Sequence, residues 1–295
     1  MLTSPSGGRL RTPWLQPGDF TIYDLSRAFM RAKLMRSVSN VTAEAVAEDL
    51  EAYFLLRPSA AREIRRDVVL IDRGGPFRSA VRVRLERDVG VSIEAVRAWF
   101  RMRDRQAFSW KLGAHTTPAD LEATLRDHGA YEVEEHTAMI LDREPPAVEG
   151  IDVRAVESYE DYVQSQEIMD VGFSGKFSPE ERAAARESLP ARFADYRAYP
   201  ISRRYLAFID GKAAAAGNAM RTSEGVLALA GGATLPEARG RGAYRALVRM
   251  RWDDAVAAGT PALVTQASAM SRPILEHLGF RVLGPVRELI DATYP

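Results

Sequence analysis

The stretch "TLPEARGRGAYRALVRMRW", residues 234–252, places two glycines and several arginines directly before a run of apolar residues at helical spacing. The apolar pattern predicts a helix that begins near Tyr244. The N–H groups in the first turn of a helix lack intrahelical partners and carry partial positive charge. Gly240 and Gly242 let a ligand approach the backbone without a Cβ in the way. The stretch therefore predicts an anion site suited to a phosphate group.

Spacing separates this loop from two other phosphate-binding motifs. A Walker loop requires G-x-x-x-x-G-K-[ST], but here the glycines are two residues apart and no lysine follows them. A dinucleotide-binding fingerprint requires a third glycine, and the sequence has Arg245 at that position. On the loop alone, a solvated turn that caps the helix remains an alternative interpretation.

The loop resembles the acyl-CoA pyrophosphate loop of the GCN5-related N-acetyltransferases (GNAT), whose pattern is [QR]-x-x-G-x-[GA]. Residues 239–242 match its first four positions, whereas Tyr244 stands where the family prefers Gly or Ala. There Tyr244 either covers the pyrophosphate or starts the apolar face of the helix. The family flanks the loop with a strand ending in proline and with a helix, a strand and a second helix ending in Leu-Gly-Phe. "LAGGATLPEARGRG" and "ALVTQASAMSRPILEHLGF" supply these flanks, so the resemblance covers roughly residues 151–290.

The resemblance implies acetyl-CoA as cosubstrate and no metal. The backbone groups of Thr234 and Leu235 are expected to pair with the pantetheine arm and to polarise the thioester carbonyl. Thr234, through its backbone, is the one catalytic contact that this resemblance assigns. Amides over residues 240–245 are expected to hold the pyrophosphate, and Ser268 falls where the family often has an Asn that touches CoA. The implied cofactor-binding residues are Thr234, Leu235, Arg239, Gly240, Arg241, Gly242, Ala243, Tyr244, Arg245 and Ser268.

The acid and base of the family pattern are missing. Many relatives have an acidic residue or His on the strand before the loop, where this chain has Ala228 and Ala230. Many also have a Tyr that protonates the leaving thiolate, where this chain has Leu275. The base then lies in the helical insert of residues 170–200, or water carries the proton, or the domain binds CoA without turnover. His277 is expected to be a surface or packing residue.

Two functions follow from the resemblance. The first is an N-acetyltransferase that moves acetyl from acetyl-CoA to an amine of a small molecule or peptide by direct attack. The second is a CoA-binding pseudoenzyme or sensor whose first domain binds a partner. The small residues on the strand before the loop predict a roomy acceptor site, but they do not select the amine.

The segment "REPPAVEG", residues 143–150, has two adjacent prolines, charges and a closing glycine, and predicts a linker. It divides the chain into residues 1–142 and 151–295, each of ordinary domain size. The second is expected to be the acetyl-CoA-binding domain. The first, which lacks an Arg-Gly loop, resembles a degenerate acetyltransferase-like repeat in "FSWKLG…PADLEATLRDHGAYEVEEHTAMILD". An unrelated α/β domain is the alternative for this half.

Local patterns give the expected elements. In the first half they predict helices over 22–36, 42–56, 92–103 and 118–128, and strands over 67–72 and 79–86. In the second half they predict a Ser-capped helix near 158–170, helical residues over 179–195 and a hairpin around Asp210-Gly211. Hairpins mixed with a strand–helix–strand unit predict an α/β fold with a mixed sheet. The resemblance implies two acetyltransferase-like domains, each a mixed, mostly antiparallel sheet flanked by helices.

The amino-acid composition limits the classes of partner that the chain is expected to bind. Lys plus Arg and Asp plus Glu number 40 each, so net charge gives no reason to expect nucleic acid or a membrane surface. The chain has no cysteine, which excludes disulfides, thiolate metal sites and a Cys nucleophile. The three His residues of the first half have spacings that form no metal set. No apolar run approaches a membrane span, so the chain is expected to be cytoplasmic, with a homodimer left open.

Overall fold

The computed structural model describes residues 41–75, 77–86, 88–173 and 178–294, and the helix expected over 22–36 lies outside them. The first half contributes α2 (Ala43–Glu48), α3 (Leu50–Tyr53), β1 (Ala61–Ile64), β2 (Val69–Asp72), β3 (Arg78–Val81), α4 (Val89–Arg101), β4 (Ala107–Leu112), α5 (Leu121–Asp127) and β5 (Tyr131–Leu141). The expected helix over 42–56 is therefore two short helices. The expected strand over 79–86 ends at Val81, because Arg82 adopts a left-handed φ of 51°.

The second half contributes β6 (Asp152–Ala155), α6 (Tyr159–Gly172), α7 (Pro179–Glu187), α8 (Leu189–Ala198), β7 (Ser202–Ile209), β8 (Lys212–Arg221), β9 (Leu227–Thr234), a 3-10 turn η1 (Pro236–Ala238), α9 (Ala243–Ala257), β10 (Leu263–Ala267), α10 (Arg272–His277) and β11 (Arg281–Ala292). The Ser158 hydroxyl caps α6 by accepting from the N–H of Asp161. Asp210 and Gly211 both have positive φ, as a two-residue hairpin turn requires. Both local predictions are confirmed.

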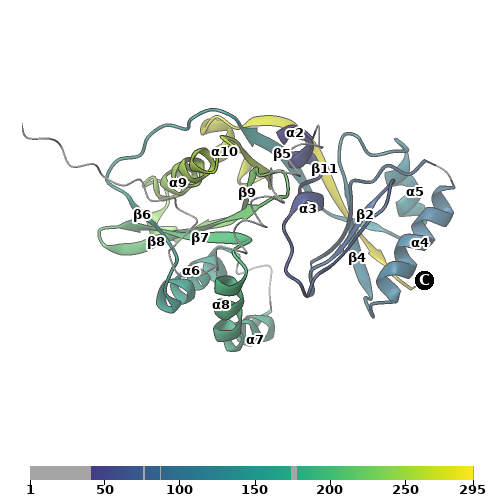
Figure 1. Ribbon diagram of the computed structural model, residues 1–295, viewed down its shortest axis with the longest axis horizontal. Coiled ribbons are helices and arrows are strands. Elements are labelled where there is room, and N and C mark those ends of the chain that lie inside the picture. Colours follow the sequence, from purple (N-terminus) through teal and green to yellow (C-terminus); the bar gives the residue numbers. More distant parts are fainter. Residues whose placement is uncertain (1–40, 76, 87, 174–177, 295) are drawn as a thin grey trace, which may run out of the picture.

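One sheet of 11 strands runs through the described chain in the order β1-β2-β3-β4-β11-β5-β10-β9-β8-β7-β6. Neighbouring strands are antiparallel except for the pairs β3–β4 and β9–β10. In the second half, α9 and α10 cover one face of the sheet and α6, α7 and α8 cover the other (Figure 1). In the first half, α4 and α5 pack on β2, β3 and β4. The predicted α/β class with a mostly antiparallel sheet flanked by helices is confirmed.

Each half gives its last strand to the other half. β5 pairs with β10 of the second half over five residues, and β11 pairs with β4 of the first half over six. β5 and β11 also pair with each other. Figure 1 shows β11 entering the first half beside β4. Residues 143–150 form no helix or strand. The segment that divides the sequence thus does not divide the sheet, and strand exchange makes one sheet where two were expected.

One buried and one partly buried carboxylate of β11 anchor it in the first half. Asp291, 1% exposed, accepts from Arg97 of α4 at 2.8–3.2 Å and from Trp110 Nε1 of β4 at 2.9 Å. Glu288 accepts from the Ser109 hydroxyl and from Lys111 Nζ, both on β4. Burial would raise the pKa of Glu288, but hydrogen bonds from His136, Lys111 and Ser109 and the charge of Lys111 lower it to about 2.

Glu288→Gln is expected to destabilise the protein at pH 7 and to flatten its acid unfolding. A carboxyl group whose pKa is depressed in the folded state stabilises the fold above its unfolded pKa, and that stability is lost as pH falls through the folded pKa. For Glu288 the window runs from about pH 5 to pH 2, and the contribution is about 3 kcal/mol. Urea unfolding at pH 7 and pH 3 measures it. Glu135→Gln, at an exposed ion pair of β5, is the control. A pH slope that is equal in wild type and Glu288→Gln would contradict the prediction.

Candidate active site

The parallel strands β9 and β10 pair for two residues and then separate. Leu227 and Ala228 are in register with Leu263 and Val264, and no ladder joins the remainder of the two strands. The last link is a side-chain bond, from Thr265 Oγ1 to the Leu229 carbonyl at 3.2 Å. Beyond it, the register between β8 and β9 shifts and Gly231 adopts φ +83°, which is the geometry of a β-bulge. A gap between the two strands therefore opens at the bulge.

Two backbone N–H groups of β9 face this gap. Bonded and non-bonded pairs alternate along an antiparallel ladder. Leu235 donates to the Ala214 carbonyl at 2.9 Å, so the groups of Gly232 and Thr234 point away from β8. The orientation of Thr234 fits its predicted role as a backbone donor. The Leu235 N–H is used by β8 and its carbonyl accepts from Ala238 N, so its backbone is less suited to pair with a ligand.

Sequence reasoning counted Gly232 among the small residues of this strand but did not predict it as a backbone donor. It forms a non-bonded pair with Gly217 of β8 and lies directly after the bulge, nearer than Thr234 to the point where the strands separate. The available signal was the Gly-Gly pair within an otherwise apolar strand, since such a pair often marks a bulge or a close backbone approach. Gly232 is therefore a second candidate donor, placed deeper in the gap than Thr234.

The Arg-Gly loop joins the end of β9 to α9. Gly240 and Gly242 have φ of +76° and +94°, which only glycine adopts readily, and Gly242 is the N-cap of α9. No side chain caps this helix. The N–H groups of its first turn, at residues 243–245, are thus left for a ligand at the positive end of the helix dipole. The structure places this candidate anion site at the open end of the gap between β9 and β10.

The three arginines of the loop point in different directions. Arg239 Nε lies 3.5 Å from the Thr234 carbonyl, between the gap and the loop. Arg241 pairs with Asp210 at 2.8 Å, in an exposed ion pair. A Cβ built on Gly242 would lie 3.4 Å from Arg245 Nη2 and 3.6 Å from Val148 Cγ1. Arg239 and Arg245 therefore border the anion site, while Arg241 is held on the β7–β8 turn.

Tyr244 fixes α9 against β9. A Cβ built on Gly232 would lie 2.9 Å from Tyr244 Cε2, so the ring rests on the glycine backbone. The guanidinium of Arg251 lies 5.8 Å from the centre of the Tyr244 ring. Arg251 is fully buried and donates to the carbonyls of Leu247 and Asn218. Burial lowers the pKa of Arg251. Tyr244 thus packs into the helix–sheet core, which favours the second of its two expected roles.

The positions where relatives hold an acid or base offer none here. Ala228 is buried in the core, and Leu275 is 2% exposed among the apolar residues under α10. His277 is exposed at the end of α10. Ser268 follows β10, where its hydroxyl lies 3.3 Å from that of Ser271. The gap therefore presents backbone groups and small side chains, and the role predicted for Ser268 remains a prediction.

The corresponding place in the first half is closed. β3 and β4 pair over two residues, but Arg84 then bridges to Thr117, so no gap opens. The Asp88 carboxylate caps α4 by accepting from the Val91 N–H at 3.2 Å, and so occupies the end of the helix that would bind an anion. A phosphate group would meet this negative charge. The first half therefore lacks an anion site at α4.

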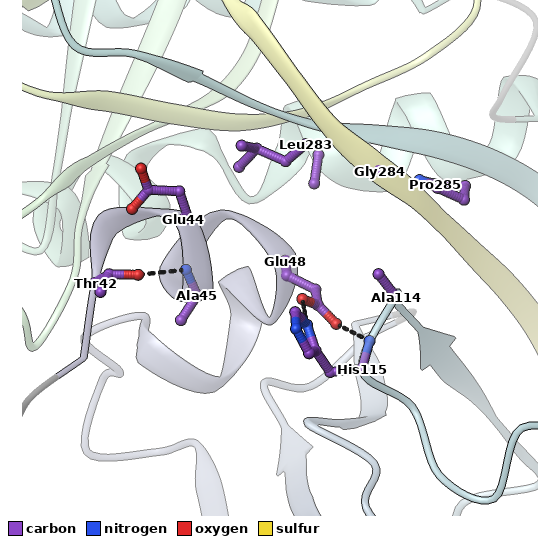
Figure 2. A pocket seen from close by; sticks show the side chains of 10 residues that line it. Thr42, Glu44, Ala45, Glu48, Ala114, His115, Leu283, Gly284 and Pro285 are labelled. Carbon is purple, nitrogen blue, oxygen red and sulfur yellow. Dashed lines mark hydrogen bonds and ion pairs between the residues drawn. The ribbon is translucent and has the colours of Figure 1, made fainter.

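Helix α2 packs its carboxylates against this closed region. Glu48 accepts from the His115 backbone N–H at 2.7 Å and contacts His115 Nδ1, as Figure 2 shows. Asp49 pairs with Arg84 at 2.9 Å, and burial raises the pKa of Asp49 to about 6. A cavity of about 350 Å³ lies beside α2, with residues 283–285 of β11 on its opposite wall (Figure 2). The cavity is thus lined by both halves of the chain.

Among the residues that the structure describes, no group of three His, Asp or Glu side chains is arranged to hold a metal ion. Within the described part of the chain, no helix is both long and apolar enough to span a bilayer.

No family model matches the sequence, and no curated protein matches it. Solved structures do. A GCN5-related N-acetyltransferase from Kribbella flavida has a TM-score of 0.61 at 19% identity, over 86% of this chain and 96% of its own. A tandem GNAT protein from the clavulanic acid biosynthesis pathway has a TM-score of 0.56 at 16% identity, over 92% and 95%. A GCN5-related N-acetyltransferase from Sphaerobacter thermophilus has a TM-score of 0.53 at 18% identity, over 92% of each chain. The chain therefore has the fold of the GCN5-related N-acetyltransferases in its tandem form.

Proposed function

We propose that residues 151–295 bind acetyl-CoA and transfer its acetyl group to an amine. One observation carries the proposal: the uncapped N-terminus of α9, with Gly240 and Gly242 at positive φ, lies at the open end of a gap into which two backbone N–H groups point. Such a helix end suits a pyrophosphate. A gap between two strands suits the extended pantetheine arm of acetyl-CoA. The solved structures of similar fold that are named N-acetyltransferases support this interpretation.

The chemistry follows from these groups. The amides of residues 243–245 hold the pyrophosphate, with Arg239 and Arg245 beside it. The N–H of Thr234 or Gly232 donates a hydrogen bond to the thioester oxygen as negative charge grows on it, which stabilises the tetrahedral intermediate. The amine nitrogen attacks the carbonyl carbon, the C–S bond breaks, and an amide and CoA result. Holding the thioester beside the amine supplies the entropic part of catalysis.

Protons travel through water in this proposal. The attacking amine must lose a proton and the thiolate must gain one, yet Ala228, Ala230 and Leu275 can do neither. The pH–rate profile should then follow the pKa of the acceptor amine.

The missing acid and base also favour a second function, a CoA-binding sensor without turnover. Release of free thiol from acetyl-CoA over a panel of amines separates the two. Release above the uncatalysed rate supports the enzyme, and tight CoA binding with no release on any amine supports the sensor.

Gly242→Asp is expected to weaken acetyl-CoA binding about 10- to 100-fold in isothermal titration, or about 1.4–3 kcal/mol. The new carboxylate would cap α9 as Asp88 caps α4, and would thereby occupy the anion site. Asp88 has a left-handed φ of 40°, whereas Gly242 has φ +94°, so the Tm of the variant is the check on its fold.

Gly259→Asp is the matched control. Gly259 has φ +78° and open space around it, but it lies beyond the other end of α9. This variant should bind acetyl-CoA like the wild type. Equal binding by all three proteins would place the cofactor elsewhere, and no binding even to wild type would favour the capping-turn interpretation.

A further inference from the structure

Arg204 of β7 is a largely buried cation without a carboxylate. Its Nη1 donates to Ser165 Oγ at 3.2 Å and to Gln166 Oε1 at 3.3 Å, and its guanidinium stacks over the Tyr162 ring at 4.2 Å. No ion pair joins it to any residue that the structure describes. Burial lowers the pKa of Arg204, although an arginine remains charged in any protein. Its charge is thus balanced by neutral oxygens alone.

The neighbouring charges do not compensate it. Arg192 shares the Gln166 oxygen at 3.2 Å, and the charges of Arg192 and Arg57 further lower the pKa of Arg204. Asp195 of α8 is paired with Arg57 at 3.0 Å. Asp170 of α6 accepts from Gln166 Nε2 at 2.8 Å. Arg192 and Arg57 thus add positive charge near Arg204, and an unpaired charge that is partly removed from water is costly unless a partner completes it.

The sheet aligns Arg204 with the bulge of β9. Arg204 is in register with Asn218 of β8, and Asn218 lies at the register shift that forms the bulge opposite Gly231. Both side chains share the α6 face, because residues two apart point the same way and Leu206 and Ala216 pack under α6. The side-chain amide of Asn218 has no hydrogen-bond partner among the residues described. The side chain of Asn218 lies between Arg204 and the β9 bulge.

Helix α6 borders the same place. A Cβ built on Gly231 would lie 3.0 Å from Met169 Cε, and one built on Gly172 would lie 2.4 Å from Ala233 Cβ. β7 and β9 are two strand spacings apart, or about 10 Å. An extended arginine side chain covers a good part of that distance.

We propose that the acceptor carries a carboxylate, which Arg204 binds while the amine lies at the β9 bulge. This inference rests on the proposed function and names its substrate class. A guanidinium binds a carboxylate through two parallel hydrogen bonds, and Nη1 is the only guanidinium nitrogen of Arg204 that is hydrogen-bonded to described residues. A polyamine would instead meet like charge on this face. Amino acids and ω-amino acids are therefore preferred over unsubstituted amines.

The first experiment compares, on the wild-type protein, acceptors that carry a carboxylate with their neutral carboxamides. Thiol release from acetyl-CoA is measured with glycine, β-alanine, 4-aminobutyrate and L-leucine, each against its carboxamide. We expect kcat/KM to be about 10- to 100-fold higher for the acid in at least one pair, the usual weight of a charged hydrogen bond. Release without a preference in any pair overturns the inference and leaves the proposed function standing.

The second experiment uses variants. Arg204→Met should raise KM for the acid about 10- to 100-fold and leave kcat for the carboxamide and the Kd of acetyl-CoA unchanged. Arg204→Lys should regain part of the preference for the acid. Arg154→Met is the control, because Arg154 also stacks on an aromatic ring of this face, Phe208, but lies on the edge strand β6. An equal loss for the acid and its carboxamide in Arg204→Met would show a merely structural role and overturn the inference.

A binding measurement distinguishes failure of this inference from failure of the proposed function. With CoA present, the N-acetyl derivatives of the acids should raise Tm in the wild type and not in Arg204→Met, while the N-acetyl carboxamides should shift neither. This result supports the inference even where no thiol is released. Failure of the proposed function shows instead as an absence of acetyl-CoA binding. CoA binding with no shift from any acid product overturns the inference alone.

Discussion

Thr234→Pro is expected to slow acetyl transfer by about 10²–10³, the usual loss when one oxyanion donor is removed. The substitution deletes an N–H that points into the gap and makes no bond to β8, so the ladder of β9 keeps its bonds. Ala233 already lies in a strand, the conformation that a residue before proline prefers. Steady-state rates at saturating acetyl-CoA, with Tm as the check on folding, measure the effect.

Thr234→Val is the control for this position. It keeps the N–H and changes only the hydroxyl, so its rate should stay within about tenfold of the wild type, or about 1.4 kcal/mol. A wild-type rate in Thr234→Pro would move the oxyanion contact to Gly232, the other N–H that faces the gap. An enzyme pKa near 7 that disappears in His277→Ala would overturn the water-mediated proton route as well.

Asp291→Ala is expected to lower the free energy of unfolding by about 3–5 kcal/mol, because it leaves the largely buried guanidinium of Arg97 without its carboxylate. The Trp110 indole N–H loses its acceptor at the same time. Because these groups join β11 to α4 and β4, the loss loosens the exchanged strand. Urea unfolding at pH 7 measures the change.

Asp142→Ala provides the comparison. Asp142 forms an ion pair with Arg281 at 2.7 Å, in which both side chains are more than 40% exposed, and such pairs contribute about 0–1 kcal/mol. If Asp291→Ala cost no more than Asp142→Ala, the buried pair would not anchor the strand, and apolar contacts would have to hold β11 in place.

Local patterns in the sequence predicted most of the elements of the second half. The anion loop at the start of α9 could be predicted because its features are local: two glycines, an uncapped helix start and a strand before it. The hairpin at Asp210-Gly211 and the Ser158 cap depend likewise on a few adjacent residues. The expected helix over 42–56 failed at Phe54, whose bridge to Thr222 is a contact between distant segments.

Strand exchange left no signal in the sequence. β5 and β11 alternate like strands of any antiparallel sheet, and alternation indicates which face a residue takes but not which strand lies beside it. In the sequence, Asp291 and Glu288 are ordinary polar positions of a strand. Their ion pairs with Arg97 and Lys111 form only in the folded structure. Arg204, the candidate residue for binding the acceptor substrate, could not be identified from the sequence for the same reason. Its neighbours lie on another helix and another strand, so no spacing in the sequence predicts them.

The exchange of terminal strands also fixes when the protein can finish folding. During synthesis, the first half emerges with β4 as an open edge, because the strand that covers β4 is made of residues 281–292. β5 waits likewise for both β10 and β11. A ribosome therefore releases almost the whole chain before either half can complete its sheet. Nascent chains stalled before β11 should remain sensitive to protease in both halves, and the two should become resistant together.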